Sequence, residues 1–160
     1  TLKGTSILLD AGANVDCKAA QLFQFAIMGD VYARMVRGVR NPKVGLLSNG
    51  EEESKGTETT RAAHEVLKGL PLNYIGYVEG RDINNGKVDV VVTDGFTGNV
   101  ALKTMEGFYD FVQGQLKTLF SSRKTAFPPF HKVEHCFDSE NIDIPRGILM
   151  FSRGGQNTQN

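Results

Sequence analysis

The residues best suited to chemistry lie between Val88 and Lys103, in the sequence VDVVVTDGFTGNVALK. The segment opens with the apolar character of a buried strand, which ends in Asp94. The loop that follows offers three small residues, Gly95, Thr97 and Gly98. A new helix is predicted to begin near Asn99, and a helix start combines free backbone N–H groups with the positive end of the helix dipole. This segment therefore predicts an anion-binding strand–loop–helix.

Further polar residues extend this candidate site. Lys103 follows Asn99 by four residues, so a helix places both on one face. Lys55 is a second candidate cation, although an ordinary solvated loop lysine explains its position equally well. Asp94 either contacts the ligand or accepts hydrogen bonds from the N–H groups of its own loop. For Asn14, the alternative to ligand contact is a turn residue that tolerates left-handed backbone geometry.

Residues 50–57, GEEESKGT, superficially match the phosphate loop of nucleotide-binding proteins. Their lysine and second glycine stand in swapped order, and three glutamates would face the phosphates, so we reject this interpretation. The run from Glu51 to Glu53 is interpreted as a solvated acidic turn rather than as a metal site or a general base. A zinc site at His131, His135 and Cys136 lacks a partner motif. We therefore predict no metal and no cofactor.

Charge and cysteine content narrow the class of protein. The chain has 160 residues, enough for one domain with a sizeable core. Its 18 basic and 18 acidic residues cancel, which leaves no overall basic field for binding nucleic acid. Two cysteines are too few for a disulfide framework and fit a reducing cytosol. No apolar run is long enough for a membrane span, and a strand so near the start suggests a missing upstream part.

Four apolar runs predict strands, and helical patterns separate them. The strands are expected at residues 7–10, 44–47, 74–78 and 88–93. Helices are expected at about residues 19–37 and 57–68, and from Asn99 onward. Such alternation favours an α/β fold with right-handed crossovers and a mostly parallel sheet. The polar segments 10–14, 48–55 and 94–99 would then share the carboxyl edge of the sheet, where ligands bind in folds of this class.

The last predicted helix carries an apolar stripe, and the segment after it has no sustained period. The stripe comprises Phe108, Phe111, Val112, Leu116, Leu119 and Phe120. On this pattern alone, a core or dimer face is favoured over a helix that lies in a membrane interface. We expect a domain over residues 1–120 and a poorly ordered, atypical tail over residues 121–160.

Six segments stand in the order and spacing of one known family. They are LLDAGANVDC (8–17), QFAIMGDVYAR (24–34), NPKVGLL (41–47), GEEESKG (50–56), NYIGYVEGRDI (73–83) and VDVVVTDGFTGNVALKTMEG (88–107). In these segments the sequence resembles the bacterial phosphate acyltransferase of phospholipid synthesis, the PlsX family. No single segment is specific, and it is their shared order from about Ser6 to Phe120 that carries the resemblance.

The resemblance implies an enzyme, a fold and a set of partners. The fold would be the three-layer α/β/α type shared with isocitrate dehydrogenase and phosphotransacetylase, here incomplete. The reaction would move a fatty acyl group from acyl-acyl carrier protein to inorganic phosphate and give acyl phosphate. The resemblance further implies a cytoplasmic homodimer that contacts the inner face of the cell membrane peripherally, with the helix from Met105 to Phe120 as the candidate contact.

Acyl transfer to phosphate gives each candidate residue a hypothetical role. Phosphate attack on a thioester needs an anion site and stabilisation of a tetrahedral oxyanion. We assign Lys55 and Lys103 to the phosphate charge, and Asn99 with the N–H groups of residues 95–98 to the oxyanion. Asp94 and Asn14 would set the loop geometry. No covalent nucleophile of the enzyme is required, because positioning of two substrates contributes much of the rate.

The chain departs from the family pattern at two residues and at both ends. Ser48 and Tyr77 stand where the family usually has asparagine. The family's amino-terminal half, with its DAMGGD loop, and a later YGGAPLLG-like segment have no counterpart here. Two alternatives remain: an inactive fragment that only dimerises or binds membrane or carrier protein, and a phosphotransacetylase-type enzyme that uses acyl-CoA. Docking of the carrier protein would need basic residues near the cleft, and the candidates are Arg34, Arg37, Arg40 and Lys43. The alternative for these residues is the solvated end of a helix.

Overall fold

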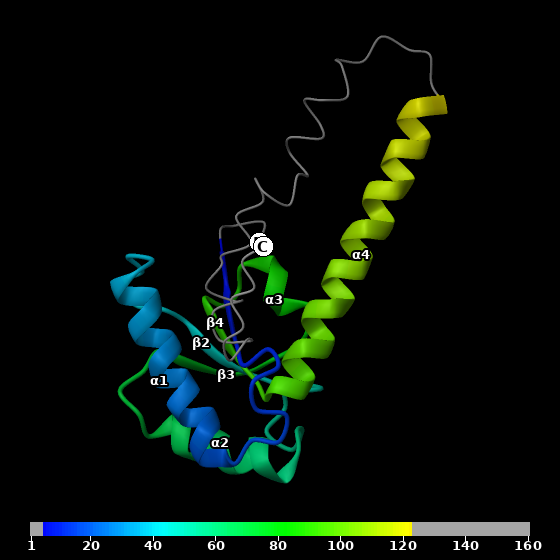
Figure 1. The fold of residues 1–160 in the computed structure, drawn as a ribbon. Coiled ribbons are helices and arrows are strands. Elements are labelled where there is room, and N and C mark those ends of the chain that lie inside the picture. Colours follow the sequence, from blue (N-terminus) through cyan, green and yellow to red (C-terminus); the bar gives the residue numbers. More distant parts are fainter. Residues whose placement is uncertain (1–4, 123–160) are drawn as a thin grey trace, which may run out of the picture.

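The computed structural model describes residues 5–122, which form one sheet flanked by helices (Figure 1). The elements are β1 (Ile7–Leu9), α1 (Ala19–Met35), β2 (Val44–Leu47), α2 (Glu58–Lys68), β3 (Tyr74–Val78), α3 (Asp82–Asn85), β4 (Val90–Val92) and α4 (Gly95–Ser122). The strand order across the sheet is β1-β4-β2-β3, and every pairing is parallel. The predicted α/β fold with a parallel sheet is confirmed.

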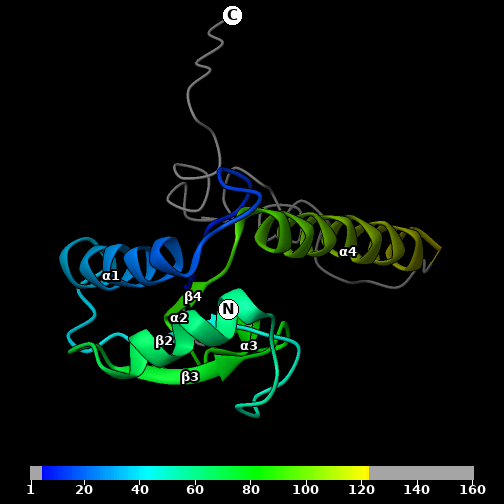
Figure 2. The same cartoon turned by 90° about the horizontal axis from the view of Figure 1, so that it is seen from below.

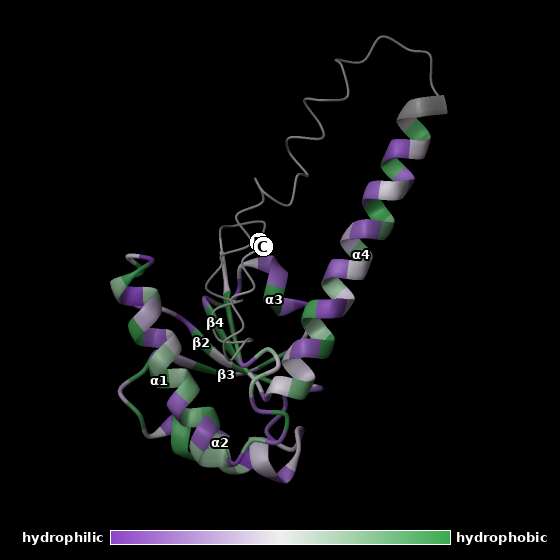
Figure 3. Ribbon diagram, in the orientation of Figure 1, coloured by the Kyte–Doolittle hydropathy of each residue, from purple (hydrophilic) through white to green (hydrophobic). Residues whose placement is uncertain are grey.

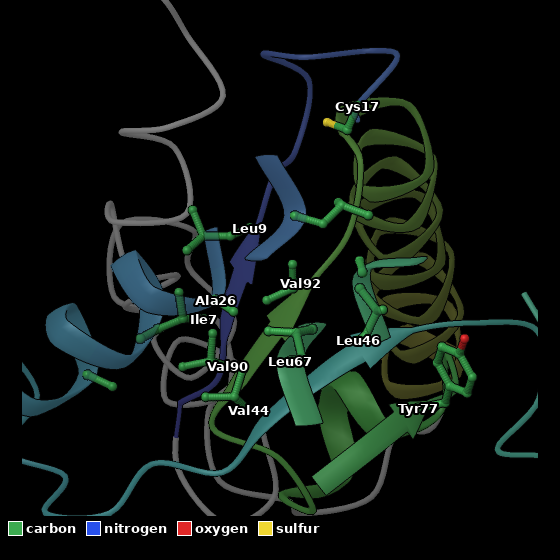
Figure 4. Packing of buried hydrophobic residues seen from close by; sticks show 13 residues of the cluster. Ile7, Leu9, Cys17, Ala26, Val44, Leu46, Leu67, Tyr77, Val90 and Val92 are labelled. Carbon is green, nitrogen blue, oxygen red and sulfur yellow. The ribbon is translucent and has the colours of Figure 1, made fainter. Parts of the chain in front are cut away.

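The sheet is covered on both faces, because alternate residues of its strands point to opposite sides. One face packs against α1 and α2 and carries Ile7, Leu9, Val44, Leu46, Tyr77, Val90 and Val92 (Figure 4). The other face packs against α3 and the first turns of α4 and carries Leu8, Leu47, Val78 and Val91. These helices on both faces give a partial version of the predicted three layers.

Helix α1 lies close to the sheet because a glycine faces it. A Cβ atom built at Gly29 would overlap Cγ1 of Val90 and lie 3.1 Å from Cδ1 of Leu9. The small residues Ala26 and Ala33 are fully buried on the same side of the helix. A larger side chain at position 29 would therefore push α1 away from β1 and β4.

Helix α2 starts and ends as its sequence predicts. The side chain of its N-cap residue, Thr57, accepts a hydrogen bond from the N–H of Thr60 at 3.2 Å, and Gly69 is the C-cap. His64 lies on the helix face that packs against β3 and is only 5% exposed. Its Nδ1 lies 2.6 Å from the hydroxyl of Tyr74, and its ring stacks on Tyr77 with centroids 4.3 Å apart.

Burial of His64 makes the stability of the protein pH-dependent. Burial lowers the pKa of the imidazole, the charge of Lys68 lowers it further, and Glu65 and Glu53 partly offset the change. The unfolded chain then binds the proton more readily than the folded chain. The free energy of unfolding should therefore be full above about pH 6.5, the usual pKa of histidine, and should fall as the pH decreases from there.

Denaturant unfolding measured from pH 8 to pH 5 tests this prediction on the wild type and on His64→Gln. We expect the wild type to lose more stability than the variant over the lower half of this range, since glutamine does not titrate. Parallel curves for the two proteins would show that His64 does not contribute to the pH dependence.

Helix α4 begins at Gly95, before the predicted start near Asn99, and its outer part leaves the sheet (Figures 1 and 2). Leu102 and Met105 pack on the sheet, whereas Phe108 and Phe111 are 67% and 61% exposed. Figure 3 shows apolar and polar residues interspersed along this outer part. Within residues 5–119 the stripe is therefore no part of the core, contrary to the core interpretation. None of the helices within residues 5–122 is long and apolar enough to cross a membrane.

The predicted boundary at residue 120 falls inside a helix, because α4 continues to Ser122. The rest of the predicted tail, residues 123–160, lies outside the described residues. The group His131, His135 and Cys136 lies there too.

Candidate functional site

Three loops leave the sheet side by side at its carboxyl edge. The strand register pairs Leu9 with Val92 and Leu46 with Val92, so β1, β4 and β2 end at one level. The loops that follow begin at Asp10, Thr93 and Ser48. Figure 1 shows the blue loop after β1 beside the start of α4. The structure thus brings the predicted polar segments to one edge of the sheet.

Asp10 organises the loop after β1. Its side chain is buried, and the residue is 2% exposed. Its carboxylate accepts hydrogen bonds from the backbone N–H groups of Gly12, Ala13 and Asn14 at 3.1, 2.9 and 2.7 Å. The side-chain amide of Asn14 donates a fourth, at 2.9 Å. Asn14 therefore contributes to the loop geometry, but without the left-handed backbone that the turn interpretation expected, because only glycines have a positive φ within residues 5–122. Asp10 is the group that fixes the loop geometry.

Replacing Asp10 by asparagine should destabilise the protein strongly. Asparagine offers one acceptor oxygen and two donor hydrogens to a pocket of N–H donors, so at least one donor is left unpaired in a buried place. We expect a loss of about 2–3 kcal/mol in the free energy of unfolding, measured in urea. Asp16→Asn is the matched control, since Asp16 is exposed in the same loop. Equal stability of the two variants would contradict this account of Asp10.

Two glycines allow the start of α4 to lie in contact with the loop after β1. A Cβ atom at Gly98 would overlap the carbonyl oxygen of Asp10 and lie 2.8 Å from Cγ2 of Thr93. A Cβ atom at Gly95 would lie 2.8 Å from the carbonyl oxygen of Asn14. These two glycines are therefore needed for the close approach of two backbones rather than for chain flexibility.

Three backbone N–H groups at the start of α4 already have partners in the protein. The N–H of Gly95 donates to the carbonyl of Asn14 at 2.8 Å, and that of Gly98 to the carbonyl of Asp94 at 2.9 Å. The carboxylate of Asp94 accepts from both the N–H and the hydroxyl of Thr97, at 2.7 and 2.8 Å. Asp94 thus caps its own loop, one of its two predicted roles. An oxyanion bound here would compete with these protein acceptors.

Asn99 and Lys103 lie one turn apart near the start of α4, as their spacing predicts. Asn99 is exposed, and its amide nitrogen lies 2.8 Å from the Cβ position of Gly12 in the neighbouring loop. The side chain of Lys103 is 66% exposed, and its ammonium group pairs with Glu106 at 2.6 Å. The charge of Lys103 is therefore partly neutralised, whereas the side-chain amide of Asn99 lies against the loop after β1.

Lys55 lies in the loop after β2, at the same edge of the sheet. Its Cγ and Cδ atoms lie 2.8 and 3.2 Å from the Cβ position of Gly50. Its ammonium group forms no ion pair with any of residues 5–122. The side-chain oxygen of Asn49 accepts a hydrogen bond from the N–H of Gly56 at 2.9 Å, which closes the loop. Lys55 is the candidate cation whose charge is available to a ligand.

The acidic run beside Lys55 is exposed, as predicted, but it is not simply solvated. Glu51 pairs with Lys87 at 2.6 Å and Glu53 with Lys68 at 2.7 Å. These pairs could not be predicted from the sequence, because their members are far apart in the chain. Over the described residues, 5–122, no group of three or more His, Cys, Asp or Glu side chains is arranged to hold a metal ion.

The two departures from the family pattern fall in different places. Tyr77 is 4% exposed and stacks on His64 in the core beneath α2. Ser48 is half-buried at the edge of the sheet, with its hydroxyl 3.4 Å from the side-chain oxygen of Asn49. Ser48 is thus part of the loop that carries Lys55, whereas Tyr77 packs beneath α2.

The proposed docking charges lie at the other edge of the sheet. Helix α1 ends at the edge of the sheet at which β2 begins. At this edge the backbone carbonyl of Lys43 accepts hydrogen bonds from the N–H groups of Asp89 and Val90, at the start of β4. Arg34 is already paired with Asp30, with two hydrogen bonds of 2.8 and 3.1 Å. These residues are thus at the amino edge, opposite Lys55 and Asn99.

The parallel sheet with helices on both faces defines an α/β fold, a class in which ligands bind at the carboxyl edge of the sheet. The chain matches the family described as "Fatty acid synthesis protein" over residues 1–128. It therefore belongs to that family, and the resemblance to the bacterial phosphate acyltransferases is confirmed.

Curated relatives share high identity with this chain. It is 62% identical over 169 aligned residues to the phosphate acyltransferase of Citrifermentans bemidjiense, with 98% of this chain and 48% of the relative covered. Identity is 64% over 121 residues to that of Anaeromyxobacter sp. strain Fw109-5 (76% and 34% covered). It is 47% over 171 residues to that of Geobacter sulfurreducens (99% and 49% covered). The chain thus spans about half the length, or less, of the curated relatives it matches.

Proposed function

We propose that this chain is part of an acyltransferase that moves a fatty acyl group from acyl-acyl carrier protein to inorganic phosphate. The product would be acyl phosphate for phospholipid synthesis. The observation that carries the proposal is the identity of 62% to a relative named phosphate acyltransferase. The geometry supports it, because Lys55 follows β2 and Asn99 lies in the first turns of α4 after the neighbouring strand β4, at the edge where ligands bind in such folds.

In this reaction a phosphate oxygen attacks the carbonyl carbon of the thioester. The new C–O bond gives a tetrahedral oxyanion, which collapses as the C–S bond breaks and the thiolate leaves with the electron pair. The protein must hold the phosphate and stabilise the oxyanion. Cys17 is no candidate nucleophile, since it is buried, burial raises the pKa of its thiol, and its sulfur contacts the carbonyl of Asn14 at 3.3 Å.

The site residues divide according to which groups are still available. Lys55 binds the phosphate, and Lys103 contributes only part of its charge because Glu106 shares it. The amide of Asn99 donates to the oxyanion. The N–H groups of Gly95, Thr97 and Gly98 have protein acceptors, so these residues, with Asp94 and Asn14, mainly hold the loops in place.

The choice of thioester donor separates this reaction from that of a phosphotransacetylase-type enzyme. We expect phosphate-dependent formation of acyl phosphate, followed by ³¹P NMR, to be faster with acyl-acyl carrier protein than with acyl-CoA at equal concentration. A faster reaction with acyl-CoA would favour the phosphotransacetylase-type alternative instead.

Membrane contact and dimerisation form a second part of the proposal. The exposed side chains of Phe108 and Phe111 on the outer part of α4 favour peripheral contact of a cytoplasmic protein with the inner face of the membrane, or a homodimer face. Co-sedimentation with vesicles of anionic phospholipid tests the first, and sedimentation velocity tests the second. The same exposed surface also suits the alternative of an inactive fragment that only dimerises or binds membrane.

A further inference from the structure

The loop that carries Lys55 is tied to the segment after β3 by a single glutamate. The carboxylate of Glu51 lies 2.6 Å from the ammonium group of Lys87 and 3.9 Å from the guanidinium of Arg81. Lys87 also lies 3.3 Å from the carboxylate of Asp82. Glu51 thus pairs with the ammonium group of Lys87, which also pairs with the carboxylate of Asp82.

Asp82 fixes the position of Lys87, because its own carboxylate is buried and hydrogen-bonded. It is 2% exposed and accepts hydrogen bonds from the N–H of Glu79 at 3.0 Å and from the side chain of Asn85 at 2.7 Å. Two hydrogen bonds and the ammonium group of Lys87 thus fix the carboxylate of Asp82, and Asp82 in turn fixes Lys87. Glu51 therefore meets a cation whose place is set by the fold of α3.

The other end of the same loop is held separately. Glu53 pairs with Lys68 of α2 at 2.7 Å, and the N–H of Gly56 donates to Asn49. Glu52, between the two paired glutamates, has no ion pair within residues 5–122, and its carboxylate lies over Gly50. The acidic run therefore contains two glutamates engaged with distant lysines and one that is not.

We propose that Glu51, through Lys87, is a positioning residue for Lys55. This inference rests on the proposed function, in which Lys55 binds the phosphate. The pair has two effects: it holds the loop across the ends of β2 and β3, and it keeps the carboxylate of Glu51 away from the ammonium group of Lys55. Without Lys87, the Glu51 carboxylate is free to pair with Lys55 four residues later and to compete with an anion.

The test uses the whole chain, labelled with ¹⁵N, and two readouts that do not require turnover. Amide hydrogen exchange at Lys55 and Gly56 reports loop order. The N–H of Lys55 donates to the backbone carbonyl of Glu52, and the N–H of Gly56 donates to the side-chain oxygen of Asn49. The shift of the Lys55 amide on addition of inorganic phosphate, at constant ionic strength, reports binding. The variants are Glu51→Gln, Lys87→Met, both together, and Glu52→Gln as the matched control.

We expect Glu51→Gln and Lys87→Met each to speed exchange at both amides about threefold, the scale of a half-exposed ion pair. The phosphate concentration at half-saturation should rise by a similar factor. The double variant should match Lys87→Met, because the pair between Glu51 and Lys87 is already lost there, and Glu52→Gln should match the wild type. Lys87→Arg, which keeps the cation, should restore most of the binding.

Three results would overturn the inference. Unchanged exchange in Glu51→Gln would show that the pair does not hold the loop. Faster exchange with unchanged phosphate binding would show that the loop is held for another purpose. If phosphate shifts the Lys55 amide in neither the wild type nor any variant, the proposed role of Lys55 itself fails. In that case the exchange data still show whether Glu51 and Lys87 act as a pair.

Discussion

Gly98→Ala should unfold the candidate site, with a loss of about 3 kcal/mol or more in the free energy of unfolding. The added methyl group would overlap the carbonyl oxygen of Asp10 and lie 2.8 Å from Cγ2 of Thr93. The first of these is a backbone atom of the buried residue Asp10, whose side chain four hydrogen bonds hold to its loop, so it cannot move aside cheaply. Relief would require the start of α4 to shift from the loop after β1. Urea unfolding followed by circular dichroism measures the loss.

Gly107→Ala is the matched control, because it makes the same change in the same helix. A Cβ atom at Gly107 meets nothing within 4 Å. Alanine is the better helix former, so this variant should be about 0.5–1 kcal/mol more stable than the wild type. If Gly98→Ala instead gained stability as Gly107→Ala does, the close contact of the two loops would be refuted.

Lys55→Ala should lower kcat/KM for phosphate by about 100-fold. Lys55 is the candidate cation with no ion-pair partner among residues 5–122, so its charge is available to phosphate and to the developing negative charge of the transition state. Removal of one donor of that kind from an active site typically costs a factor of 100 to about 1,000. Because the side chain is exposed, the stability of the folded chain should hardly change. Initial rates over a series of phosphate concentrations give the ratio.

Lys103→Ala provides the comparison for this loss. Its ammonium group already pairs with Glu106 at 2.6 Å, so we expect a smaller reduction, of about tenfold. A larger loss for Lys103→Ala than for Lys55→Ala would reverse the assignment of the phosphate charge between the two lysines.

Much of the fold could be predicted from the sequence because its signals are local. Apolar runs marked β2 and β3 at the bounds that the structure has, and Thr57 and Gly69 marked both ends of α2. The start of α4 was predicted too late, although a local signal existed. Asp94 followed three residues later by Thr97 is an N-cap pattern, and the structure shows both hydrogen bonds.

Features that depend on distant residues could not be predicted in the same way. The pair of Glu51 with Lys87 joins residues 36 apart, and the burial of His64 depends on Tyr74 and Tyr77 in the next strand. Nothing in the spacing of α1 shows that its basic end lies opposite the site, because that follows from the packing of the helix against the strands. By contrast, the hydrogen bonds of Asp10 are local, and an aspartate before Gly-Ala-Asn was a sufficient signal for them.

The most direct test of the account is the formation of acyl phosphate by the purified chain from acyl-acyl carrier protein and inorganic phosphate. Folding is verified first by circular dichroism, and the product is followed by ³¹P NMR. We expect a product whose rate of formation saturates with phosphate and falls about 100-fold in Lys55→Ala. A folded chain that forms no acyl phosphate, or that forms it at the same rate in Lys55→Ala, would contradict the claim that the carboxyl edge of this sheet holds a working phosphate site.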